Sequence, residues 1–90
     1  MRLSFPNSSR SFDEAKNRVR FWGYDRAIEI SFFVEGDALK RFSPQTGSAE
    51  ARFLTAFDAA RQRIHEVAEK VYVRNRKNGS YSFVLVAADF

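Results

Sequence analysis

The chain has 90 residues, of which 44% are hydrophobic and 16% are aromatic, including ten Phe. This composition excludes a disordered protein, and a chain of this length supports a single hydrophobic core, so we expect one domain over residues 1–90. The absence of Cys excludes disulfides and thiolate metal sites, and a net charge of +4 favours an anionic partner only slightly.

The N-terminal part carries the first local signal. Ser11 and Glu14 have the spacing of a helix capping box, in which a Ser is followed three residues later by a Glu. This spacing predicts a brief helical turn.

Two strands are predicted next, because apolar residues alternate with other residues over Val19–Phe21 and Ile28–Val34. The segment Gly23–Arg26 between them is typical of a hairpin connection, either a two-residue turn or a four-residue loop. Both connections pair Phe21 with Ile28 on the core face. On the other face they set Arg20 opposite Glu29.

Helices are predicted in the middle of the chain. A short one covers Asp37–Phe42, the polar cluster Ser43–Gly47 interrupts the chain, and Thr46 or Ser48 can cap the helix that follows. The apolar residues of this second helix recur at spacings of three and four and form one core stripe: Phe53, Phe57, Ala60, Ile64, Val67 and Val71.

The end of the second helix has two interpretations. A helix over Ala49–Asn75 would be about 40 Å long, which exceeds the roughly 30 Å diameter of a domain of this size. The helix therefore either projects to Asn75, which we favour, or ends near Lys70. In the second case Val71–Val73 forms an additional strand, joined to the last strand by the turn Asn78-Gly79.

The last strand, Tyr81–Ala87, has apolar residues on both faces, which predicts a central or covered strand that completes an antiparallel sheet. Together the elements predict an α+β domain in the order β-β-α-α-β. Its three-stranded, mostly antiparallel sheet, with room for a fourth strand, packs against one long and one short helix.

Short segments along the chain carry a resemblance to a known family. They are Phe5-Pro6-Asn7, Ser11-Phe12-Asp13, Val19-Arg20-Phe21-Trp22-Gly23, Phe32-Phe33-Val34, Phe57-Asp58-Ala59, the spacing of Ile64, Ala68 and Tyr72, and Asp89-Phe90. With them nearly the whole chain resembles a small bacterial family catalogued as domain-of-unknown-function family fourteen-eighty-eight. The resemblance implies an α+β bacterial domain without an assigned activity, so it carries over no functional residues.

The one histidine, His65, begins a segment that differs from the helical zinc-protease motif because Glu69 replaces the second His. A zinc site needs three or four ligands, and the chain offers no second His and no Cys. No Ser has the setting of a nucleophile elbow, and no Gly-rich phosphate cradle is present. We therefore expect no metal, no cofactor, no small-molecule ligand and no enzymatic activity.

The densest positive charge is the run Arg74, Arg76 and Lys77 near the end of the long helix, where it is a candidate for contact with anions. These cations also complement the negative end of the helix dipole, which contributes about 0.3–1 kcal/mol without any ligand. We favour this stabilising role.

The outer face of the predicted hairpin is the candidate interaction face, with Arg18, Arg20, Trp22 and Phe33 as its main residues. Such side chains can stack on single-stranded bases, but the neighbouring Glu29 and Glu35 repel phosphates. Small monomers seldom leave large aromatic side chains together in water, so we expect this face to be covered. The cover is either a second copy of the chain or its own segment Leu3–Phe12.

These observations favour a non-enzymatic interaction or regulatory module that forms a homodimer. The alternative is a protein that binds nucleic acid weakly and without sequence specificity through its basic surface. The segment Met1–Pro6 lacks the apolar run of a signal peptide, and Phe83–Ala88, the most apolar segment, is too short to cross a membrane. We expect a cytoplasmic protein that does not engage a membrane.

Overall fold

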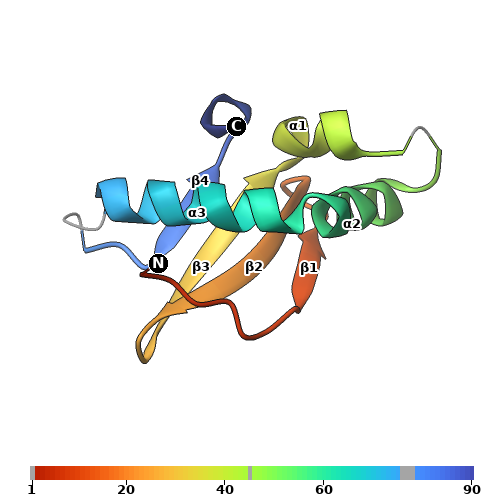
Figure 1. The fold of residues 1–90 in the computed structure, drawn as a ribbon. Helices are drawn as coiled ribbons and strands as arrows, with labels where there is room; N and C mark the ends of the chain where they lie inside the picture. The colour runs from red at the N-terminus through yellow and green to blue at the C-terminus, as the bar shows by residue number, and fades with distance from the viewer. Residues whose placement is uncertain (1, 45, 76–78) are drawn as a thin grey trace.

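The computed structural model describes residues 2–44, 46–75 and 79–90, and it has an α+β fold (Figure 1). Four strands form one sheet in the order β1-β2-β3-β4. The elements in chain order are β1 (Arg10–Asp13), β2 (Arg18–Asp25), β3 (Ile28–Glu35), α1 (Gly36–Leu39), the 3₁₀ turn η1 (Lys40–Phe42), α2 (Ala49–Ala59), α3 (Arg61–Asn75), β4 (Ser82–Leu85) and the 3₁₀ turn η3 (Ala87–Asp89).

The helices lie together on one side of the sheet, so the described chain forms two layers (Figure 1). The core lies between these layers and contains Phe21 and Phe32 from the sheet and Phe57 from α2, all completely buried. The Phe21 ring centroid lies 5.2 Å from that of Phe32 and 5.1 Å from that of Phe57. The predicted α+β class, with its fourth strand, is confirmed.

The fourth strand is β1, at the position where a helical turn was expected. Arg10–Asp13 pairs with β2 in antiparallel fashion, and the following turn brings Asn17 to a positive φ of 52°. The capping-box prediction is wrong because strand pairing lets Phe12 point toward the helices, where its ring packs against Phe53. Burial of an aromatic side chain outweighs a local capping signal.

The hairpin of β2 and β3 has the predicted faces but not the predicted register. Its turn consists of Arg26 and Ala27, with Arg26 at a positive φ of 59°, and β2 continues through Gly23 to Asp25. Phe21 therefore lies opposite Phe32 and not Ile28.

The shift in register also changes the partners on the outer face, where Arg20 lies opposite Phe33 and not Glu29. Because the shift is an even number of residues, each side chain stays on its predicted face. The exception in burial is Ile28, which is 49% exposed next to the hairpin turn.

The predicted long helix is two helices, α2 and α3, separated at Ala60. Ala60 has φ −108° and ψ 16°, which lie outside the helical range, and its N–H still bonds to Ala56 and Phe57. All six residues of the predicted stripe are buried, and α3 ends at Asn75 as favoured, so Val71–Val73 is not a strand. The break lets the segment bend as it crosses the sheet, as Figure 1 shows.

Two further predictions about the helices are confirmed. α1 and η1 occupy the position of the short helix, and Ser48 is the N-cap of α2, where its Oγ accepts a hydrogen bond from the Ala51 N–H at 3.2 Å. A side-chain acceptor at this position satisfies one of the free N–H groups of the first helical turn.

Strand β4 pairs with β3 in parallel and lies at the edge of the sheet, so the prediction of a central or covered strand that completes an antiparallel sheet is wrong. The chain leaves β3 at Glu35 and returns along α3, which ends beside the start of β4, so β4 has to run in the direction of β3 (Figure 1). Phe83 and Leu85 face the core, whereas Val84 faces away from it and is 42% exposed.

Candidate interaction face on the open side of the sheet

The side of the sheet that faces away from the helices carries no described helix or loop, and we call it the outer face (Figure 1). Strand alternation assigns to it the residues out of phase with the buried positions. They are Ser11 and Asp13 of β1, Arg18, Arg20, Trp22 and Tyr24 of β2, Glu29, Ser31, Phe33 and Glu35 of β3, and Ser82 and Val84 of β4.

Two arginines and two aromatic side chains form the centre of the outer face. The Arg18 Cζ lies 3.8 Å from the centroid of the Phe33 ring, and the Arg20 Cζ lies 5.0 Å from that of Trp22. Arg20 is also within 6.0 Å of the Phe33 ring centroid, so its guanidinium lies near both rings. The structure thus brings together the four residues that the sequence singled out.

Polar contacts hold both guanidiniums in place. The Arg18 Nε donates to the Asp13 Oδ2 at 3.0 Å, and the Arg20 Nη2 donates to the Ser31 Oγ at 3.2 Å. The Arg20 Nε is buried and has no hydrogen-bond partner among the described residues. The centre of the outer face is therefore ordered by contacts among its own side chains.

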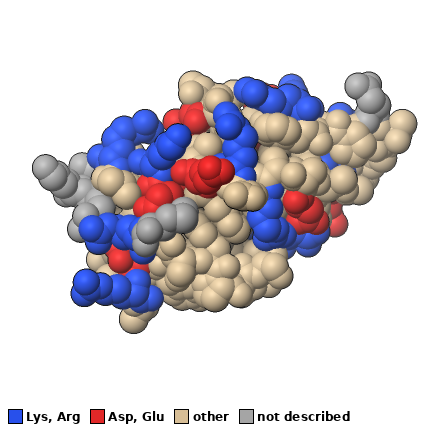
Figure 2. Space-filling model, viewed as in Figure 1, with Lys and Arg blue, Asp and Glu red and all other residues tan. Residues whose placement is uncertain are grey.

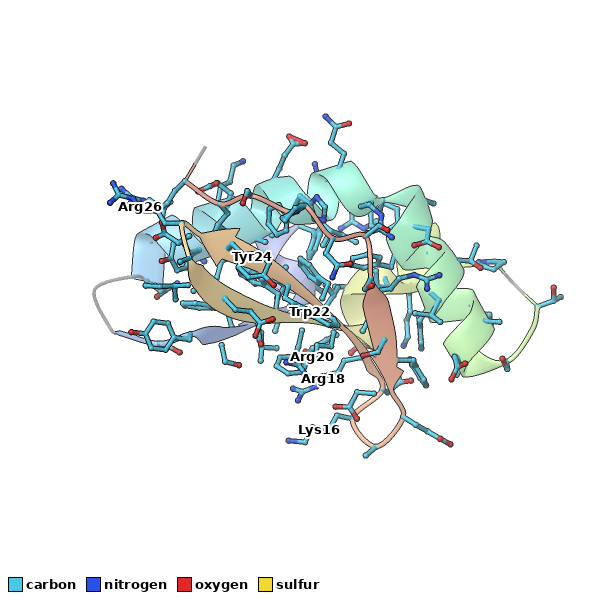
Figure 3. The ribbon with its side chains drawn as sticks, turned by 90° about the horizontal axis from the view of Figure 1, so that it is seen from below. Lys16, Arg18, Arg20, Trp22, Tyr24 and Arg26 are labelled. Atoms are coloured by element: carbon cyan, nitrogen blue, oxygen red, sulfur yellow. The ribbon has the colours of Figure 1, made fainter. Side chains whose placement is uncertain are left out.

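Sequence reasoning predicted the members of this face within the hairpin strands and missed others, among them Tyr24 and Asp13. Tyr24 was assigned to the hairpin turn, but it extends the outward series of β2, and Figure 3 shows it following Arg18, Arg20 and Trp22 along the strand. Asp13 was assigned to a helical turn. Continuing the period-two pattern beyond Phe21 is the signal that would have found Tyr24.

The outer face carries charges of both signs. Three carboxylates, those of Asp13, Glu29 and Glu35, lie on the same side of the sheet as the guanidiniums of Arg18 and Arg20. The carboxylates of Glu29 and Glu35 are exposed and make no hydrogen bond or ion pair within the described chain. The two arginines lie on β2, and the two glutamates lie on the neighbouring strand β3.

The N-terminal segment does not cover the outer face. The Leu3 N–H donates to the Glu69 Oε1 at 2.9 Å on the helical side, and Ser4 exchanges two backbone hydrogen bonds with Tyr24 at the sheet edge, of 2.9 and 2.8 Å. The Phe5 ring stacks on His65 with centroids 3.9 Å apart. Cover of Trp22 and Phe33 by Leu3–Phe12, one of the two expected arrangements, is therefore wrong.

The edge of the sheet at β4 is shielded by side chains. The Ser80 Oγ donates to the Ser82 carbonyl at 2.9 Å and accepts from the Ser82 N–H at 3.3 Å. The Asp89 Oδ2 accepts from the Val86 N–H at 2.9 Å. Within the described chain these contacts leave only the Val84 backbone groups unpaired along this edge, which discourages the addition of another strand.

The basic run at the end of α3 is only partly described. Arg74 forms an ion pair with Asp89 at 3.5 Å, whereas Arg76 and Lys77 lie outside the described residues. On the side of the molecule that Figure 2 shows, Lys and Arg are interspersed with Asp and Glu. No basic patch of one sign is visible on that side.

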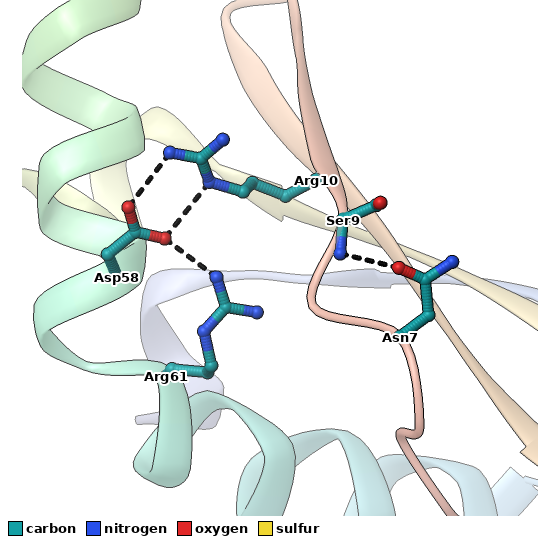
Figure 4. A network of polar contacts seen from close by, with 5 residues as sticks. All are labelled: Asn7, Ser9, Arg10, Asp58 and Arg61. Atoms are coloured by element: carbon teal, nitrogen blue, oxygen red, sulfur yellow. Dashed lines mark hydrogen bonds and ion pairs between the residues drawn. The ribbon is translucent and has the colours of Figure 1, made fainter.

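A second polar cluster joins β1 to the helices (Figure 4). Asp58 accepts from the Arg10 Nε and Nη2 at 3.0 and 2.8 Å and from the Arg61 Nη2 at 2.7 Å. The hydrogen bonds from Arg10 are the largest cause of a lowered pKa at Asp58. With its carboxylate ionised and both arginines engaged, the cluster clamps β1 to the break between α2 and α3.

No group of three or more His, Cys, Asp or Glu side chains is placed to share a metal ion within residues 2–44, 46–75 and 79–90. An open cleft of about 440 Å³ lies between the β1–β2 turn and the start of α2, lined by Phe12, Glu14, Asn17, Ser48, Ala49 and Glu50. The hydroxyl of this lining, that of Ser48, accepts the N-cap hydrogen bond of α2 from the Ala51 N–H.

The helices of the described chain are also too short and too polar to span a bilayer. In a comparison with known proteins, the model of a family described as proteins of unknown function, DUF1488, matches residues 3–85 of the chain. No curated protein and no solved structure matches the chain.

Proposed function

The chain belongs to DUF1488, a family of proteins of unknown function, and we propose that it is a non-enzymatic module. In this proposal it associates with a second copy of itself through the outer face. The proposal includes a bacterial, cytoplasmic setting, with which the absence of Cys is compatible.

The observation that carries this proposal is the stacking of Arg18 on Phe33 and of Arg20 on Trp22. Arginine and aromatic side chains are enriched where proteins bind one another, and they dominate the binding energy. Since the guanidiniums are already held by Asp13 and Ser31, little side-chain freedom remains to be lost on association.

The charge balance favours a protein partner over nucleic acid. A nucleic-acid-binding sheet combines stacking aromatics with a surface that attracts phosphates. Here three carboxylates face two guanidiniums on the outer face, so the strands themselves present no positive surface. The second candidate function, weak and non-specific nucleic-acid binding, is supported by Trp22, Tyr24 and Phe33 as stacking platforms and opposed by this balance.

The test is the oligomeric state of the wild type and of Trp22→Ala, measured by sedimentation or light scattering over a range of concentrations. We expect the wild type to dimerise and Trp22→Ala to lose affinity by about tenfold or more, which corresponds to 1.4 kcal/mol or more. Val73→Ala is the matched control, because Val73 is 49% exposed on the helical side.

A wild type that stays monomeric at all concentrations would contradict the proposal. So would equal losses in Trp22→Ala and Val73→Ala. Titration with fluorescent single-stranded DNA and RNA covers the alternative: tight binding that disappears in Trp22→Ala, together with a monomeric wild type, would assign the outer face to nucleic acid.

A further inference from the structure

We propose that the two copies pack face to face about a two-fold axis parallel to β2 and β3, so that Arg18 of each copy binds Glu35 of the other. This inference rests on the proposed function and names the contacts that would define it. It follows from the way the strand register distributes charge over the outer face.

The register places positive and negative side chains at the same heights on neighbouring strands. Arg18 of β2 lies opposite Glu35 of β3, and Tyr24 of β2 lies opposite Glu29 of β3. β2 thus contributes the donors of the outer face, and β3 contributes two carboxylates without partners within the described chain.

Rotation by a half turn about an axis between β2 and β3, parallel to both, keeps every height and exchanges the two strands. The second copy then lays its β2 over β3 of the first. Arg18 reaches Glu35, the Tyr24 hydroxyl reaches Glu29, and the large Trp22 meets the small Ser31. Each contact occurs twice, as in any isologous dimer.

A two-fold axis at right angles to the strands gives a poorer fit. It would lay β3 over β3 in the opposite direction about the middle of the hairpin, near Phe32, and would bring Glu29 of one copy against Glu35 of the other. Like charges placed together in an interface are unfavourable. Of the two axes, the one parallel to the strands therefore satisfies the charges.

The side chains are free to make these contacts. The Arg18 Nε bonds to Asp13, whereas its two terminal nitrogens make no hydrogen bond within the described chain. With its Cζ 3.8 Å from the centroid of the Phe33 ring, the guanidinium is turned toward β3. Aligned sheets in sandwiches cross at roughly 30°, and the length of the Arg and Glu side chains accommodates that angle.

The experiment uses two charge-reversal variants, Arg18→Glu and Glu35→Arg, each alone and as an equal mixture. In the proposed arrangement each variant alone faces like charges twice, so its dimer affinity should fall by about tenfold or more. In the mixture both contacts are restored between unlike chains, so the affinity should return to within about threefold of the wild type.

Glu66→Arg and Lys70→Glu are the matched controls, because they reverse charges on exposed positions of α3 and should leave the dimer unchanged. Circular dichroism melts establish that each variant is folded. If Arg18→Glu alone is unfolded, the double variant Arg18→Glu/Glu35→Arg replaces it, and this variant should dimerise like the wild type.

The outcomes separate this inference from the proposed function. A monomeric wild type overturns both. A wild-type dimer that is lost in Trp22→Ala but unaffected by either charge reversal overturns the arrangement and leaves the proposed function standing. Two weakened variants whose mixture stays monomeric would also overturn the pairing of Arg18 with Glu35.

Discussion

Phe5 and His65 stack face to face, with ring centroids 3.9 Å apart and ring planes 7° from parallel. Phe5 also lies against Phe21, so the N-terminal segment holds the imidazole against the core. Burial, followed by the charge of Arg61, lowers the pKa of His65 below its ordinary value. The neutral imidazole is therefore the form that packs against Phe5.

The lowered pKa predicts how stability depends on pH. In the unfolded chain His65 takes up a proton near its ordinary pKa of about 6.5, whereas the folded protein resists protonation. Its contribution is complete above about pH 6.5 and is lost as the pH falls through the lower pKa of the folded state. Urea unfolding between about pH 8 and pH 5 should show this loss in the wild type. His65→Phe keeps an aromatic ring but cannot titrate, so it should lose less stability over the same pH range. Parallel curves of unfolding free energy against pH for the wild type and His65→Phe would refute the assignment of the loss to His65.

Gly23 is required by the close approach of Phe5. A Cβ at position 23 would lie 2.6 Å from the Phe5 ring and 3.0 Å from the Ser4 carbonyl oxygen. Gly23→Ala should therefore cost about 1–3 kcal/mol in denaturant unfolding. In a Phe5→Ala background the same substitution should cost clearly less, because the clash with the ring is gone. An equal cost in both backgrounds would mean that Phe5 does not press on this strand.

The Asp58 cluster makes a modest, pH-dependent contribution. Asp58 bonds to both Arg10 and Arg61 but is half-exposed, so Asp58→Asn should cost about 0.2–1 kcal/mol near neutral pH. Because hydrogen bonds from Arg10 lower the pKa of Asp58, this contribution is present above its ordinary value of about 3.9 and is lost as the pH falls through the lower, folded value. Asp37→Asn removes the more exposed pair with Lys40 and should cost less. Equal costs of Asp58→Asn and Asp37→Asn would show that the Asp58 cluster contributes no more stability than the exposed Asp37–Lys40 pair.

Arg20 and Arg18 differ in what their removal costs the fold. Arg20→Met loses the bond to Ser31 and the longer ring contacts, but it keeps the aliphatic part of the side chain and eliminates a buried Nε without a partner in the described chain, so stability should stay within about 1 kcal/mol of the wild type. Arg18→Met loses both the bond to Asp13 and the stack on Phe33 and should destabilise more. Thermal melts at one fixed protein concentration keep the contribution of association constant. A larger loss in Arg20→Met would contradict this ranking.

The sequence predicted which side chains face the core better than it predicted which residues lie opposite one another. A period of two assigns Phe21 and Ile30 to one face whatever the register, because an even shift leaves the faces unchanged. Register depends on the turn, and here the turn residues Arg26 and Ala27 include no Gly, Asn or Asp to signal it. The four central residues of the candidate interaction face, Arg18, Arg20, Trp22 and Phe33, were therefore predictable, whereas the pairing of Arg18 opposite Glu35 was not.

The path of the chain above the sheet was predictable only in part. The apolar stripe keeps its spacing through Ala60, so periodicity alone gives one helix where the structure has two. Likewise, the direction of β4 depends on where α3 ends relative to the sheet. The position of the end of α3 relative to the sheet is set by tertiary packing, and the local hydrophobic period of the sequence does not predict it.

The shielding of β4 by Ser80 and Asp89 bears on whether further chains can add to this edge of the sheet. Residues 79–88 carry no charge and include Phe83, Val84, Leu85 and Val86, a composition that in an unprotected edge strand promotes stacking into fibrils. Pairing along a sheet edge can continue without limit when each added chain offers a new edge, whereas pairing through a single face closes at two chains. Because side chains occupy the described β4 edge on both sides of Val84, the proposed pairing through the outer face would not continue into a polymer along this edge.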